Sequence, residues 1–202
     1  PVDRRGLGRR GARQRNGEPA GLHLEPAQGA AGDRGCGDTD RAAGPGYYLS
    51  ADDTDLSAFG QRCAAARAAL ADRDWRAALG AAEDALALWR GPLLEDLRDE
   101  HRVHPQAVRV EELRAECREA RISAHLALDC AAEALSEAAG LAAEQPLRER
   151  ATWLWMLALY RVGRGADALG TYAEHAAHLD AELGLQPGPE LRELQTAILR
   201  QS

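Results

Sequence analysis

The chain has 202 residues and a net charge of −7, and all 25 of its basic residues are arginine. This length allows one ordinary domain with a small companion, and it is sufficient to bury a hydrophobic core. No stretch approaches the ~20 apolar residues of a membrane-spanning helix, and the arginine-rich start lacks the apolar run of a signal peptide. We therefore expect a cytoplasmic protein, and the exclusive use of arginine indicates a bacterium with a GC-rich genome.

The charge is unevenly distributed along the chain. Residues 1–46 carry eight arginines and six acidic residues, whereas the remainder carries seventeen arginines and twenty-six acidic residues. An acidic main part argues against broad nucleic-acid binding there. We place a domain boundary near residue 50.

Residues 1–46 do not have the composition of a folded core. Glycine recurs every few positions, aliphatic residues are rare, and no period of 2 or 3.6 is present. A cluster of arginines could contact nucleic acid nonspecifically, but no aromatic residues lie between them to stack on bases. The cluster consists of Arg4, Arg5, Arg9, Arg10, Arg13 and Arg15. We expect a disordered or degenerate segment.

At residue 52 the sequence changes, and a first helix is predicted. Asp52, Asp53, Thr54 and Asp55 suit a helix start, because their side chains can accept hydrogen bonds from free N–H groups and the acids favour the helix dipole. Apolar residues then recur every three or four positions, as on one face of an amphipathic helix. That face holds Leu56, Phe59, Cys63, Ala66 and Leu70.

Two further helices follow. The second is predicted from Trp75 to Trp89 and is ended by Gly91-Pro92. Its expected apolar face holds Trp75, Leu79, Ala82, Leu86 and Trp89. The third is predicted from Pro105 to about Leu128, with an apolar face of Val108, Leu113, Cys117, Ile122 and Leu126. We expect its many glutamate and arginine residues to form a solvated face, in which each pair contributes only ~0.3 kcal/mol.

Four more helices complete the expected all-α domain, in which residues 52–202 show no strand alternation. They are predicted at Ala131 to Glu144, Arg148 to Val162, about Ala166 to Leu183, and from Pro189 or Glu190 onward. Pro146, Gly163 and Pro189 stand where such helices end or begin.

The pattern of small residues in these helices repeats. Ala134-Leu135 and Ala168-Leu169 are separated by about 34 residues, the period of TPR helical hairpins, in which a small residue lets two helices approach closely. Ala78-Leu79 offers a third copy at a larger offset, because the long third helix intervenes.

Strings in residues 52–202 resemble, in the expected order, the bacterial transcriptional activator domain (BTAD) of SARP-type regulators, the antibiotic regulatory proteins of actinobacteria. They are Asp55-Leu56 through Phe59, ALALWRGPLLEDL (85–97), RVEELR (109–114), EQPLRER (144–150), MLALYRVGRGADALGTY (156–172) and AELGLQPGPELRELQTAILRQ (181–201). The resemblance implies a TPR-like right-handed array of antiparallel helix pairs. It also implies that this domain mediates self-association and contacts with the transcription machinery.

In that family a winged helix-turn-helix precedes the helical domain, and its last strand ends in Pro-Gly-Tyr-x-Leu. Residues 45–49, Pro-Gly-Tyr-Tyr-Leu, match this ending, so we expect residues 47–51 to be a remnant of that strand. The body of the DNA-binding domain is missing before it.

One explanation is a frameshift. With permissible codons, the frame one base later turns residues 21–30 into AYISNLRRAL and the stretch from Leu7 into WGEEAPASATASLQ, both similar to the family. We hypothesise that residues 1 to about 40 are an out-of-frame reading of a winged-helix gene. A nucleotide sequence in which no single-base shift opens a family-like frame would refute this.

The resemblance thus implies a transcriptional regulator that contacts itself or the transcription machinery and binds promoter DNA only if an intact N-terminal domain exists. The alternative is a free-standing TPR-like scaffold without DNA binding. No GxSxG, HExxH or Walker motif is present in the sequence, and no Rossmann fingerprint flanked by a strand and a helix, so we expect no enzyme activity, no catalytic residues and no cofactor.

Metal binding is not expected either. The four cysteines have no CxxC spacing and are expected to be free thiols, and His125 with Cys130 is too small a set for zinc. They are Cys36, Cys63, Cys117 and Cys130. Two histidine pairs, His101 with His104 and His175 with His178, could each share a ligand, although exposed or half-packed helix histidines are more common.

The aromatic residues are the candidates for a protein-interaction surface, although most are expected in the core. The set considered is Trp75, Trp89, Trp153, Trp155 and Tyr160, and the residues chosen for the interaction surface are Trp153, Trp155, Tyr160 and Tyr172. Trp153 and Trp155 cannot face the same way on one helix. We expect one of them at a helix junction or an interface, and we expect Trp153 to be the more exposed.

Overall fold

The computed structural model describes residues 24–26, 47–49, 54–93, 96, 101 and 103–201. The chain divides into two units, Pro1–Asp52 and Asp53–Ser202. In the first unit, β1 (Leu24–Pro26) pairs antiparallel with β2 (Tyr47–Leu49), with Leu24 opposite Leu49. β2 coincides with the Tyr-Tyr-Leu of the strand motif, whereas β1 was not expected, because no alternation marks it. The arginine cluster and Cys36 lie outside the described residues.

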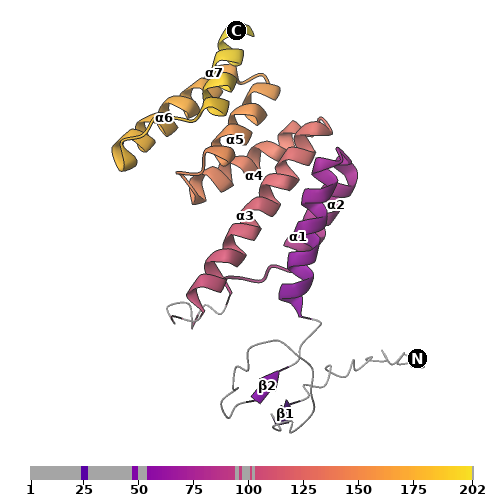
Figure 1. The fold of residues 1–202 in the computed structure, drawn as a ribbon. Helices are drawn as coiled ribbons and strands as arrows, with labels where there is room; N and C mark the ends of the chain where they lie inside the picture. The colour runs from indigo at the N-terminus through magenta and orange to yellow at the C-terminus, as the bar shows by residue number, and fades with distance from the viewer. Residues whose placement is uncertain are drawn as a thin grey trace, which may run out of the picture. The chain divides into compact units, whose positions relative to one another are not determined.

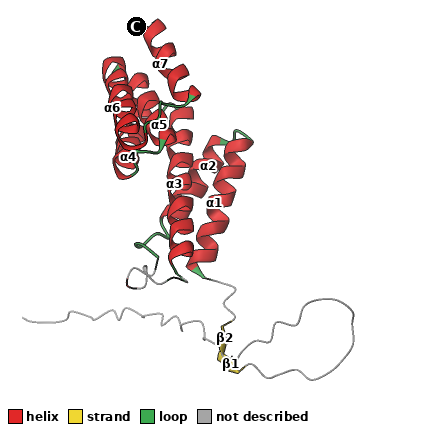
Figure 2. Cartoon of the chain, turned by 60° about the vertical axis from the view of Figure 1, so that its left-hand side comes forward, coloured by secondary structure: helices red, strands yellow, loops and turns green. Residues whose placement is uncertain are grey.

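The second unit contains the seven predicted helices. They are α1 (Asp55–Ala71), α2 (Trp75–Leu86), α3 (His104–Ala127), α4 (Ala131–Glu144), α5 (Glu149–Arg161), α6 (Gly165–Leu183) and α7 (Pro189–Gln201). Each helix up to α6 contacts the next, and the odd-numbered helices also contact one another in sequence. Figures 1 and 2 show α1 and α2 at one end of this array and α6 and α7 at the other. The all-α, TPR-like fold is confirmed.

The ends of the helices follow local hydrogen bonding. Thr54 and Ser57 form a capping box at the start of α1, with each side chain accepting from the backbone N–H of the other. The cap is thus Thr54, one of the four residues predicted at this helix start, and Asp55 is the first residue of the helix. Asp52 and Asp53 lie outside the described residues. α2 ends three residues before Trp89, because the N–H groups of Leu88 and Trp89 bond three residues back instead of four.

Alanines occupy the centre of the helix interfaces. In α2 the buried residues are Ala78, Ala82 and Ala85, whereas the predicted bulky residues of its face are only half-buried. Two residues predicted on apolar faces are exposed: Leu56 by 40% and Val108 by 51%. In α2, closely crossing helices have room only for small side chains at the crossing, which leaves the larger ones at the rim. Leu56 and Val108 lie near the starts of α1 and α3.

The repeated alanines confirm the expected hairpin packing. Ala78, Ala134 and Ala168 are each 0% exposed. Three core clusters follow one another along the array, formed mainly by α1 to α3, then α3 to α5, then α5 to α7. α5 contributes to two of them, so it is the helix that joins the middle of the array to its C-terminal end.

The glutamate and arginine residues of α3 were predicted to form a solvated face, but several of them form ion pairs with neighbouring helices. Arg121 donates two hydrogen bonds to Glu137 of α4, at 2.8 and 2.6 Å. Arg148, before α5, binds Glu119 and Glu112 of α3, and these two carboxylates raise its pKa. Because the side chains of Glu137 and Glu119 are only 12% and 14% exposed, these ion pairs link neighbouring helices rather than surface turns.

The cysteine prediction is confirmed for the described part of the chain. Cys63 and Cys117 are buried free thiols between α1 and α3, and Cys130 is half-buried and free. The Cys117 thiol donates a weak hydrogen bond to the Ala82 carbonyl at 3.7 Å. The neighbouring Cys63 side chain and, second, burial raise the pKa of Cys117, so that its thiol remains protonated.

The start of α7 is tied to α5 through one glycine. The Gly188 N–H donates to Glu149 Oε2 at 2.8 Å. A Cβ added at Gly188 would lie 2.6 Å from that oxygen, so only glycine allows this approach.

Gly188→Ala is therefore expected to lower the free energy of unfolding by about 1 kcal/mol, because the flexible Glu149 side chain must turn away and lose a charge-assisted hydrogen bond. The matched control is Gly170→Ala in the middle of α6, where an added Cβ would meet nothing within 4 Å. That control should raise the free energy of unfolding by about 0.5–1 kcal/mol through helix propensity. Denaturant unfolding measures both, and equal signs would contradict this account of Gly188.

Candidate interaction surface and ligand pocket

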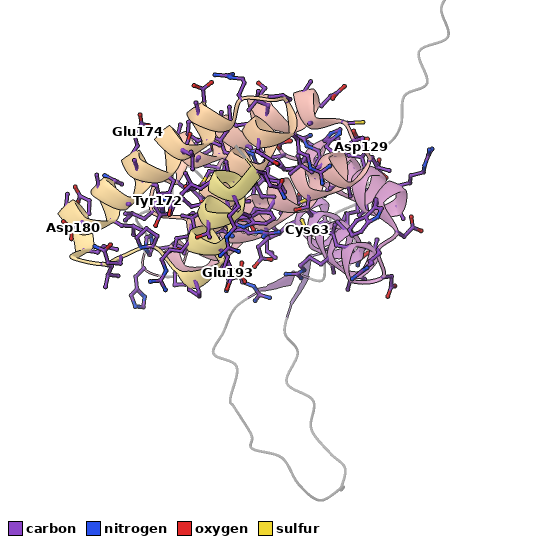
Figure 3. All side chains as sticks on the ribbon, turned by 90° about the horizontal axis from the view of Figure 1, so that it is seen from above. Cys63, Asp129, Tyr172, Glu174, Asp180 and Glu193 are labelled. Atoms are coloured by element: carbon purple, nitrogen blue, oxygen red, sulfur yellow. The ribbon has the colours of Figure 1, made fainter. Side chains whose placement is uncertain are left out.

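The four aromatic residues predicted for an interaction surface gather around one core cluster. Trp153, Trp155, Tyr160 and Tyr172 are half-buried and pack against the cluster of Met156, Leu159, Ala168, Leu191 and Ile198 between α5, α6 and α7. In Figure 3, Tyr172 lies on the inner side of α6. We call these four side chains the α5–α7 aromatic surface.

The two tryptophans of α5 line different pockets, which confirms that they face different ways. Trp153 lines a pocket of about 330 Å³ together with the Gly188–Leu191 segment at the start of α7. The Arg150 guanidinium lies over its ring, 4.4 Å from the centroid. Trp153 is thus at a helix junction, as expected. Because both tryptophans are half-buried, the greater exposure of Trp153 remains a prediction.

The two tyrosines hold the end of the array together. The Tyr160 hydroxyl donates to the Gln201 side chain and so connects the ends of α5 and α7. Tyr172 packs from α6 against the same cluster. These roles are structural, and only the uncovered edges of the rings are available to a partner.

The other tryptophans lie on helix packing surfaces nearer the start of the domain. Trp89 contacts Phe59, with ring centroids 5.7 Å apart, and the Arg114 guanidinium lies 4.8 Å from the Trp89 ring centroid. Trp75 is half-buried at the start of α2. Trp89 is part of the packing, as expected for most aromatic residues.

Trp155 lines a second pocket, of about 200 Å³, between the α4–α5 loop, α5 and α6. One of its walls is His175, which is 6% exposed and whose Nδ1 lies 3.1 Å from the Thr152 hydroxyl. His178, the other member of the predicted pair, also lines this pocket. The structure therefore brings His175 and His178 together with Thr152, which sequence reasoning had not singled out.

The charge state of His175 is set mainly by its burial. Burial lowers the pKa of the imidazole, whereas Glu149 and the Pro146 carbonyl act in the opposite direction and His178 adds to the lowering. The ring is therefore neutral when the protein is folded at neutral pH.

This lowered pKa predicts how stability depends on pH. Since the unfolded chain binds the proton more readily than the folded one, the stabilisation is present above the ordinary histidine pKa of about 6.5 and is lost as the pH falls through the folded pKa. We expect the free energy of unfolding to decrease with falling pH more steeply in the wild type than in His175→Gln. Urea unfolding at a series of pH values measures this, and identical slopes would show that His175 does not contribute.

His101 and His104 are exposed. His101 lies just before α3, and His104 is its first residue. Neither they nor His125 with Cys130 form part of a larger set: in the described segments, no group of three or more His, Cys, Asp or Glu side chains is arranged to hold a metal ion. Among the described helices, none is long and apolar enough to cross a membrane.

Known proteins match this helical domain over most of its length. The family described as bacterial transcriptional activator domain matches residues 54–199. The regulatory protein AfsR of Streptomyces griseus is 46% identical over 115 residues, which are 57% of this chain and 12% of that protein. The transcriptional regulatory protein EmbR of Mycobacterium tuberculosis is 39% identical over 163 residues, which are 79% of this chain and 42% of that protein.

A solved structure, Mycobacterium tuberculosis EmbR in complex with a low-affinity phosphopeptide, has the same fold. It superposes with a TM-score of 0.72 at 38% identity and covers 80% of this chain and 43% of that chain. This chain thus spans less than half the length of the relatives named here. The family match, the identities and the shared fold agree with one another, and the chain belongs to the bacterial transcriptional activator domain family of SARP-type regulators.

Proposed function

We propose that this chain acts in transcription regulation, and that its helical array mediates self-association or contact with the transcription machinery. The observation that carries this is the family match over residues 54–199, together with relatives that are named transcriptional regulators. Such a protein works in the cytoplasm and needs no catalytic site. Since the chain spans only part of these relatives, the activity of a whole regulator is carried over from them as a proposal.

Within the array, we propose the α5–α7 aromatic surface as the contact site. Large aromatic side chains that are half-buried combine a fixed position with an uncovered edge, and such residues dominate the binding energy of protein interfaces. Trp153 is the residue on which we place most weight, because its ring lies at the junction with α7 and carries the Arg150 guanidinium.

The test is to fuse the full 202-residue chain to an unrelated DNA-binding domain and to measure transcription of a reporter with the matching operator. Activation over the DNA-binding domain alone supports contact with the transcription machinery. Analytical ultracentrifugation of the unfused chain tests self-association. A monomer that neither activates the reporter nor retains purified RNA polymerase would refute the proposed role.

Binding of this chain to promoter DNA depends, in our proposal, on an intact winged-helix domain, of which we propose residues 47–51 as a remnant. We therefore expect the 202-residue chain to bind DNA weakly, with an affinity that falls steeply as salt is added. The alternative is a scaffold that never binds DNA. Sequence-specific promoter retention that persists at high salt would exclude that alternative and would also contradict a degenerate N-terminal segment.

A further inference from the structure

The pocket beside Trp155 contains an unusual feature, a buried imidazole nitrogen without a partner. His175 is 6% exposed, and among the described residues its Nε2 has no hydrogen-bond partner. The Pro146 carbonyl lies near enough to favour the protonated ring, but it does not form a hydrogen bond of ordinary geometry with Nε2. Buried polar atoms are nearly always hydrogen-bonded, so a buried nitrogen without a partner, on a residue that lines a pocket, favours a ligand that supplies the partner.

The neighbouring threonine decides which nitrogen carries the hydrogen. Thr171 and Thr196 donate their hydroxyl hydrogens to the backbone carbonyl four residues earlier, at 3.0 and 2.9 Å. The Thr152 hydroxyl instead lies 3.1 Å from His175 Nδ1, its only described side-chain contact. Its hydrogen is therefore free to go to Nδ1, and a neutral ring that accepts at Nδ1 carries its own hydrogen at Nε2. On this ground we assign the ring hydrogen to Nε2, so a matching ligand presents an acceptor.

The rest of the lining sets the charge and shape of that ligand. Glu174 is exposed at the outer edge of α6, as Figure 3 shows, and it places a carboxylate on the rim of the pocket. A carboxylate repels anions and accepts hydrogen bonds from N–H donors. The Trp155 indole provides an aromatic wall, and no arginine is among the residues that line this pocket. A volume of about 200 Å³ suits a molecule of one ring with one functional group.

We propose that this pocket binds a small uncharged aromatic carboxamide. Its carbonyl oxygen accepts the hydrogen of His175 Nε2, its amide N–H group donates to Glu174, and its ring packs against Trp155. Such a ligand bridges α5 and α6 through the Thr152–His175 contact. This is an effector site in the helical array. It shares Trp155 with the α5–α7 aromatic surface and goes beyond the proposed protein contacts.

The test uses benzamide as the probe and the full chain as the target. Two-dimensional NMR of the backbone amides should show saturable shifts confined to the residues around the pocket. Benzoate, which brings a negative charge toward Glu174, and aniline, which lacks the acceptor, should each bind about tenfold more weakly. Long-range nitrogen spectra of the histidine rings should show the hydrogen of His175 on Nε2 and a change there on binding. Absence of saturation, equal affinity for the three probes, or a hydrogen on Nδ1 would each overturn the proposal.

Two variants separate the chemistry of the pocket from folding. Glu174→Gln leaves an exposed position uncharged, so benzoate binding should improve by about tenfold, whereas Glu182→Gln, an exposed glutamate of α6 outside the lining, should change nothing. His175→Phe should abolish benzamide binding. If His175→Phe does not fold, comparison of the variants Glu174→Gln and Glu182→Gln still tests the proposal. An unchanged affinity of Glu174→Gln for benzoate would contradict the proposed contact.

Discussion

Replacing Leu154 by alanine is expected to lower the free energy of unfolding by about 3 kcal/mol, the typical cost of a cavity left by a buried leucine. Leu154 is 1% exposed in the cluster that joins α3, α4 and α5. Because α5 belongs to two of the three clusters, loss of packing here weakens the connection between the middle of the array and its C-terminal end. Denaturant unfolding measures the change.

The matched control is Leu199→Ala, the same substitution on α7 at a side chain that is 56% exposed. It should change the free energy of unfolding by at most about 0.5 kcal/mol. If the two variants were equally stable, the assignment of Leu154 to a packed cluster would be wrong.

The second large effect is expected at the repeated small residue. Ala168→Leu should lower the free energy of unfolding by about 2–3 kcal/mol, because Ala168 is 0% exposed and extra methyl groups force apart helices that already touch. The experiment distinguishes a TPR-like crossing from a loosely packed bundle, which would accept the larger side chain.

Ala166→Leu, on the exposed side of α6, serves as its control. It should be nearly neutral, since alanine and leucine have similar helix propensities. A neutral or stabilising Ala168→Leu would show that the alanine spacing has no packing role.

The helices were predictable from the sequence because each carries its own period and its own end signals. Gly163 has a φ of +80° after α5, and Gly184 has a φ of +65° after α6, so both ends need glycine. The repeat spacing, with the family resemblance, then predicted the TPR-like arrangement. What periodicity missed is that alanines fill the helix interfaces, whereas Leu56 and Val108, near the starts of α1 and α3, are exposed.

The pocket was not predictable, because its residues meet only in three dimensions. Thr152 and His175 are 23 residues apart on different helices, and neither belongs to a motif. The pairs Arg121–Glu137 and Arg148–Glu119 were missed for the same reason: a charged residue on a helix gives no indication of whether its partner is water or another helix. The separation of Trp153 from Trp155 followed from helical geometry alone and is confirmed.

We propose that the α5–α7 aromatic surface of this array contacts the transcription machinery. The most direct measurement compares reporter activation by fused Trp153→Ala and Trp75→Ala chains, with the free energy of unfolding measured for each. Both lose a half-buried indole, but only Trp153 belongs to that surface. We predict that Trp153→Ala reduces activation to about a tenth, as for loss of an interface hot spot, while Trp75→Ala retains activation at similar stability. Equal activation by the two variants would contradict the claim.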